Sequence, residues 1–187
     1  MKSIRYLDDF VVAVQARGMP LDECVIVGGA AFIYHGLLDE DSNGDLDFVC
    51  SRRARKGCPD NDLVLAGHVH LLCEGTFTFY GISDDAIARH EWLSTPSPEG
   101  IRFETPEALF LSRLMVLHGE LEGQTAHGAI RYNQIRQFLV ERGYNGELVG
   151  PLMEGEIKQV VCDVEVEMPP QRVVRAYDLS RLNAEVE

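Results

Sequence analysis

The segment that most constrains the fold is residues 28–48, which read GGAAFIYHGLLDEDSNGDLDF. The apolar run Cys24–Val27 precedes it and is typical of a buried strand. Two glycines then allow the backbone to approach a ligand closely where a short helix begins. Because the first turn of a helix presents unpaired N–H groups and a partial positive charge, this turn is suited to hold a phosphate.

Two aspartates one residue apart close this segment. Asp45 and Asp47 lie on the predicted strand 45–49, DLDFV. Both carboxylates therefore project from one face of the strand, while Leu46 and Phe48 point into the core. Two carboxylates on one face repel each other unless a divalent cation lies between them. Since Mg2+ accepts such ligands together with phosphate oxygens, the pair predicts a Mg2+ site.

The order of strand, Gly-Gly turn, helix and Asp-x-Asp strand resembles the nucleotidyltransferase superfamily related to DNA polymerase beta. The resemblance is to its small bacterial and phage members, including those of abortive-infection and toxin–antitoxin systems. It covers mainly residues 25–50, with weaker agreement through about residue 139. It implies an α/β fold of the α+β kind, with a mixed sheet flanked by helices. It also implies that Gly28 and Gly29 hold a nucleoside triphosphate, and that Asp45 and Asp47 hold one or two Mg2+ ions.

The residues just before the aspartates depart from the family pattern. Many members of this subgroup carry Arg-x-Thr-x there, whereas this chain has Asp-Ser-Asn-Gly at positions 41–44. Asn43 can replace the threonine as a hydrogen-bonding turn residue, and the resemblance places it among the nucleotide-binding residues. Asp41 reverses the charge of the arginine.

A third metal ligand is expected on a following strand, and two residues compete for the role. In the segment 68–74, HVHLLCE, alternation places His68, His70 and Glu74 on one face. Related enzymes have an aspartate near the position of His70, but histidine is not an equivalent hard-oxygen ligand for Mg2+. Glu74 has the right chemistry and parity, so it ranks slightly above His70 as ligand or base. Without a third acid, the chain could bind a nucleotide without transferring it.

A basic cluster follows the Asp-x-Asp strand directly. It consists of Arg52, Arg53, Arg55 and Lys56. At the mouth of the metal site, these side chains could contact a triphosphate or the end of an RNA acceptor; a solvated loop is an equal alternative. The resemblance also suggests a phosphate role for Arg113, although a helix-surface arginine is the simpler interpretation.

Composition limits the classes of protein that this chain can be. Its 187 residues are 45% hydrophobic, which favours a globular core. No signal peptide or transmembrane run is evident, which predicts a cytoplasmic protein without a membrane partner. The net charge of -13 argues against broad, nonspecific attraction to duplex DNA. The five cysteines lack CxxC spacing and are expected to be buried thiols; they are Cys24, Cys50, Cys58, Cys73 and Cys162.

Periodicity and turn residues predict the elements of the first part of the chain. A helix is expected within residues 6–17 and a connecting loop over 55–62. Strands are expected over 68–74 and 76–80, forming a hairpin around Gly75. A second loop, rich in proline and glycine, precedes a short strand at 101–103.

The rest of the chain reads mainly as helical. Helices are predicted over 106–118 and 129–142, with a glycine-containing connection between them and Gly143 as the stop. Residues 160–167 alternate as in a strand, and 178–187 read as a terminal helix or a tail that could pack on another subunit. These elements divide the chain into a nucleotidyltransferase-like core, 1–104, and a helical portion with a terminal strand and tail, 105–187.

The resemblance implies metal-dependent transfer of a nucleoside monophosphate from a nucleoside triphosphate to a hydroxyl acceptor. The acceptor could be a tRNA or another RNA, a protein or a small molecule. The main alternative is a catalytically impaired nucleotidyltransferase-like domain that binds a nucleotide or a protein. A second alternative is an acidic interaction protein in which Asp45 and Asp47 form only a solvated strand face.

Overall fold

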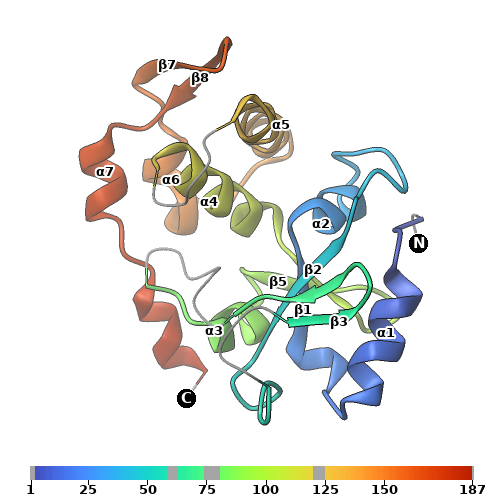
Figure 1. Ribbon diagram of the computed structural model, residues 1–187. Helices are drawn as coiled ribbons and strands as arrows, with labels where there is room; N and C mark the ends of the chain where they lie inside the picture. Colours follow the sequence, from blue (N-terminus) through green and yellow to red (C-terminus); the bar gives the residue numbers. More distant parts are fainter. Residues whose placement is uncertain (1–2, 59–62, 74–80, 120–124, 187) are drawn as a thin grey trace. The chain divides into compact units, whose positions relative to one another are not determined.

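The computed structural model describes residues 3–58, 63–73, 81–119 and 125–186, and these form two compact units. The first contains Met1–Thr105 and Ser180–Glu187, and the second Pro106–Leu179. The division therefore falls between Thr105 and Pro106, and the C-terminal segment groups with the first unit (Figure 1).

The first unit is built on a six-stranded mixed sheet. Its strands are β1 (Cys24–Val27), β2 (Leu46–Cys50), β3 (Leu63–Ala66), β4 (Val69–Leu71), β5 (Ser94–Pro96) and β6 (Arg102–Glu104). They are arranged in the order β3-β4-β2-β1-β6-β5. β1 is buried along its whole length and pairs antiparallel with β2, while β2 pairs parallel with β4. The Asp-x-Asp strand β2 is thus an interior strand of the sheet, with a neighbour on each side.

Helices and 3-10 turns cover this sheet. They are α1 (Leu7–Ala16), η1 (Leu21–Glu23), α2 (Gly28–Tyr34), α3 (Asp84–Arg89) and η2 (Ser180–Glu185). Phe10 of α1 meets Phe48 of β2 edge to face, with ring centroids 5.0 Å apart. Tyr34 of α2 stacks on Phe103 of β6 at 4.0 Å. These aromatic contacts attach α1 and the C-terminal end of α2 to the sheet.

The second unit is mainly helical. It contains α4 (Pro106–Leu117), α5 (Ala126–Arg142), α6 (Gly146–Met153) and α7 (Gln171–Ala176), together with the hairpin of β7 (Ile157–Val161) and β8 (Val164–Met168). Phe110 and Tyr132 join α4 to α5, with ring centroids 5.5 Å apart. Arg142 donates to both carboxylate oxygens of Glu107 at 2.8 Å, which links the end of α5 to the start of α4.

The mixed α/β architecture agrees with the expected fold class, and several elements agree in detail. The strand Cys24–Val27 is as expected, and the helices predicted within 6–17 and over 106–118 are present as α1 and α4. Leu46 and Phe48 are fully buried, as the alternation of β2 predicts. No helix in the described ranges is long and apolar enough to cross a bilayer.

Other expected elements are wrong or incomplete. Residues 160–167 do not form one strand, because Cys162 and Asp163 adopt positive φ and turn the chain between β7 and β8. Gly128 lies inside α5, whose N-cap is Thr125, so the preceding connection is shorter than expected. β3 pairs with β4 through a turn at Gly67, a hairpin that the pattern did not reveal. The expected strand 76–80 and its turn at Gly75 lie outside the described residues.

The cysteines only partly follow the expectation of buried thiols. All five are free, but Cys58 and Cys73 are half-buried and Cys162 is exposed. Cys24 and Cys50 are buried opposite each other on β1 and β2. Burial raises the pKa of Cys50 to about 12 and that of Cys24 still further. These two thiols are therefore protonated near neutral pH and act as small apolar side chains.

Candidate metal centre

The pairing register brings the proposed site together at one end of the central strands. In the antiparallel pair, Asp47 of β2 lies opposite Val27, the last residue of β1. In the parallel pair, Asp47 lies opposite His70 of β4. Side chains at paired positions project from the same face of a sheet. Asp47 is therefore placed between the glycine turn, which follows Val27, and the imidazole of His70.

Asp45, Asp47 and His70 form a compact group of metal-ligand type, which we call the triad. One ligand atom from each lies within 4.8 Å of the others. His70 Nδ1 is 3.5 Å from Asp47 Oδ1 and 4.0 Å from Asp45 Oδ2. Exposed fractions of 53% for Asp45, 30% for Asp47 and 32% for His70 leave the triad open to a ligand from solvent. Two carboxylates and an imidazole are a donor set that can hold a divalent cation.

The two glycines differ in their environment. Gly28 is buried at φ +62°, and a Cβ built there would lie 4.0 Å from Asp47 Oδ2. Gly29 is exposed, and its Cβ position lies 3.8 Å from the Cβ of Asn43. The glycine turn therefore lies against the Asp-x-Asp strand, and Gly29 is the glycine that faces solvent there.

The N–H of Gly28 is not available to a phosphate as expected. It donates to Glu104 Oε2 at 2.8 Å, and Glu104 is buried at the end of β6. β6 pairs parallel with β1, so Glu104, the last residue of β6, lies near Gly28, which follows β1. The predicted strand ended at residue 103, and no local signal marked Glu104 as a partner of the turn. A bound phosphate would have to approach the exposed Gly29 side of the turn.

Asn43 supports the triad from within the protein and does not present its amide to a ligand. Its side chain is buried, and its Nδ2 donates to the carbonyls of Arg5 at 3.0 Å and Asp45 at 2.8 Å. Its Oδ1 accepts from the N–H of Arg5 at 3.2 Å. These bonds occupy both amide hydrogens of Asn43 and make it a positioning residue for Asp45, and its expected nucleotide-binding role stays a prediction.

The candidate third ligands have different outcomes. His70 lies in the triad, at the sheet position opposite Asp47. Glu74, which ranked above it as catalytic and metal-binding residue, lies outside the described residues. His68 is exposed and stacks on Tyr6, with ring centroids 4.6 Å apart and planes 19° from parallel.

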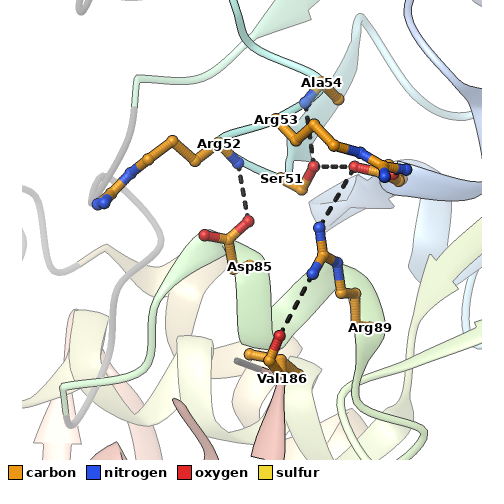
Figure 2. A network of polar contacts seen from close by, with 8 residues as sticks. Ser51, Arg52, Arg53, Ala54, Asp85, Arg89 and Val186 are labelled. Atoms are coloured by element: carbon orange, nitrogen blue, oxygen red, sulfur yellow. Dashed lines mark hydrogen bonds and ion pairs between the residues drawn. The ribbon is translucent and has the colours of Figure 1, made fainter. Parts of the chain in front are cut away.

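The expected position of the basic cluster at the mouth of the metal site is wrong. Arg52 and Arg53 follow the C-terminal end of β2, whereas Asp45 precedes its N-terminal end. Glu23, which precedes β1, accepts from Arg53 and Ser51 and lies 3.7 Å from Arg89 (Figure 2). The cluster is thus anchored at the end of β1 and β2 remote from Gly28.

A hollow of about 820 Å³ lies at this remote end. Arg52, Arg53, Arg55, Lys56 and Arg89 line it with Asp85, whose Oδ1 accepts from the N–H of Arg52 at 2.9 Å. Arg89 also donates to the carbonyl of Val186 at 3.3 Å, which attaches the C-terminal segment (Figure 2). The network holds α3 and the C-terminal segment to the sheet and gives the side chains of Arg53 and Arg89 a structural role.

If the triad binds a nucleotide, we expect the double variant Arg52→Gln/Arg53→Gln to bind it within about twofold of the wild-type affinity. The physical reason is that screening at physiological ionic strength, over a Debye length of about 8 Å, removes most of the effect of exposed charges at the far end of β2. Isothermal calorimetry with a nucleoside triphosphate and a divalent cation measures this. A loss of tenfold or more would return these arginines to the phosphate site.

Arg113 lies on α4 of the second unit. Burial lowers the pKa of His127, and the guanidinium of Arg131 and then that of Arg113 lower it further. Arg113 is therefore part of a basic group on α4 and α5. Its expected role at a phosphate stays a prediction.

Comparisons with known proteins add no family to this description. No protein-family model, curated protein or solved structure matches the chain.

Proposed function

We propose that this protein is a divalent-cation-dependent nucleotidyltransferase. It would move a nucleoside monophosphate from a nucleoside triphosphate to a hydroxyl group of an RNA, a protein or a small molecule. The observation that carries the proposal is the position of the glycine turn against the Asp-x-Asp strand: a Cβ built at Gly28 would lie 4.0 Å from Asp47 Oδ2. Gly29, the exposed member of this turn, gives a triphosphate and its cation a glycine backbone to approach near the carboxylate pair.

The ligand atoms of the triad agree only in part with those that Mg2+ prefers. Asp45 and Asp47 supply oxygens of the kind that Mg2+ prefers, whereas His70 supplies a nitrogen. The group fits a divalent cation but departs from an all-oxygen Mg2+ set. When bound, a divalent cation would neutralise phosphate charge and stabilise the attacking and leaving oxygens.

The chain's own residues would bind and orient the reactants. Gly29 is exposed and has no side chain to exclude a phosphate from that side of the turn, and Asn43 holds the backbone of Asp45 in place. In the reaction, the acceptor oxygen bonds to the α-phosphorus, the bond to the bridging oxygen breaks, and pyrophosphate leaves. The hydroxyl proton must pass to a base or to water.

Calorimetry with ATP, CTP, GTP and UTP, each with and without a divalent cation, tests the first half of this proposal. We expect at least one nucleotide to bind, and to bind about tenfold or more tightly with the cation, because the cation screens the phosphates from Asp45 and Asp47. A labelled-nucleotide transfer assay with RNA, protein and small-molecule acceptors tests the second half. The absence of binding by all four nucleotides would contradict the proposal.

Binding without transfer is a second candidate function, favoured by two specific observations. An imidazole occupies the sheet position opposite Asp47, and a protein carboxylate already accepts the N–H of Gly28. Both reduce the resemblance to an active site with three carboxylates and a free glycine turn. Cation-dependent nucleotide binding with no transfer to any acceptor would identify this impaired form.

A further inference from the structure

The third member of the triad differs in chemical kind from the other two. His70 presents Nδ1 toward both carboxylates, at 3.5 Å from Asp47 and 4.0 Å from Asp45. Within the described ranges, no other carboxylate joins this group. The oxygen donors of Asp45 and Asp47 are therefore completed on this side by a nitrogen donor.

The pairing of the strands holds the His70 imidazole at this position. Asp47 and His70 are paired positions of parallel strands, and the flanking Val69 and Leu71 are fully buried. A shift of β4 by one residue would turn these apolar side chains outward and His70 inward, which burial opposes. The imidazole is therefore held beside Asp47 by the register of the sheet.

Donor type governs which cation such a group prefers. Mg2+ is a hard ion that is held by oxygen ligands and keeps several waters. Imidazole suits Fe, Ni, Cu and Zn ions best, and along the first-row series the affinity for a given nitrogen and oxygen site rises from Mn2+, the weakest binder, toward Cu2+. Mn2+ also accepts carboxylate and phosphate oxygens, so it is the transition ion closest to Mg2+ in what it can do at a triphosphate.

We propose that the triad selects Mn2+ over Mg2+ and that His70 sets this preference. The inference concerns the same site as the proposed function and rests on it only for the phosphate oxygens of the ligand. The preference itself belongs to the side chains of Asp45, Asp47 and His70, and it can be measured without a nucleotide.

The test measures Mn2+ binding from the loss of the free-ion electron paramagnetic resonance signal, with Mg2+ as competitor. We compare the Mn2+ to Mg2+ affinity ratio of the wild-type protein with the ratios of His70→Asp and His70→Ala. His70→Asp is expected to lower the ratio about tenfold by converting the group to oxygen donors, and His70→Ala to weaken Mn2+ binding about tenfold with little change for Mg2+.

The variants control for each other, because His70→Asp adds a third carboxylate whereas His70→Ala adds no charge. Circular dichroism confirms that each is folded, as we expect for a side chain that is 32% exposed. An unchanged ratio in both folded variants would overturn the inference, as would wild-type protein that binds no Mn2+. Selective Mn2+ binding without nucleotide binding would instead uphold the inference and contradict the proposed function.

Discussion

Asp47→Asn is expected to reduce nucleotidyl transfer at least about 100-fold, equivalent to about 2.7 kcal/mol of transition-state stabilisation. Asp47 is the carboxylate that lies against both the glycine turn and His70. Asparagine keeps the shape of the side chain but removes the charge that attracts the cation. Asp45→Asn should have the same direction of effect, because the Asp45 carboxylate, just before β2, belongs to the same triad.

The same variants should keep the fold, since both side chains are partly exposed and the substitutions conserve volume. The informative measurement is therefore the melting temperature with and without a divalent cation. A ligand at 100 times its Kd stabilises the wild type by about 2.7 kcal/mol, and this gain should disappear in both variants. Asp39→Asn makes the same charge change on an exposed loop and serves as the matched control. Full transfer activity in both variants would rule out the assignment.

Local sequence patterns were sufficient to predict the two aspartates and the glycine turn of the site. Alternation identified β2 and placed Asp45 and Asp47 on one face, because Leu46 and Phe48 had to be buried. The glycine turn was readable for a similar reason: it directly follows an apolar run that became β1. Such features depend on neighbouring residues, which the sequence displays.

The rest of the site depends on which strands pair. His70 joins the triad through the parallel pairing of β4 with β2, and Glu104 reaches Gly28 through the pairing of β6 with β1. No local sequence pattern predicts either of these strand pairings. Ligand chemistry favoured Glu74, which lies outside the described residues, whereas the pairing of β4 with β2 brings His70 to Asp47.

Proximity in sequence also misled. Arg52 lies only a few residues after Asp47, yet an extended strand advances about 3.3 Å per residue and carries the chain to the other end of the sheet. The cluster consequently meets Glu23 and α3 instead of the triad. The β7–β8 turn was not predicted for a different reason: its positive-φ positions are Cys162 and Asp163, and neither is a glycine that would mark a turn.

The adjacent glycines allow stability and ligand binding to be separated. Gly28→Ala is expected to lower the free energy of unfolding by about 1–2 kcal/mol, because a Cβ is strained at φ +62°. Gly29→Ala should stabilise the protein by up to about 1 kcal/mol, since alanine favours the helix and its Cβ meets only Asn43 at 3.8 Å. Urea unfolding measures both values.

Gly29→Leu then tests the proposed path of the phosphate. A leucine at this exposed position should leave Mn2+ binding at the triad within about twofold, but it should weaken nucleotide binding about tenfold or more, equivalent to about 1.4 kcal/mol. The physical reason is that Glu104 already occupies the Gly28 N–H, which leaves the Gly29 side for a close approach. Gly29→Ala is the matched control for helix propensity. Wild-type nucleotide affinity in folded Gly29→Leu would place the phosphates away from this turn, and the triad alone would then have to account for nucleotide binding.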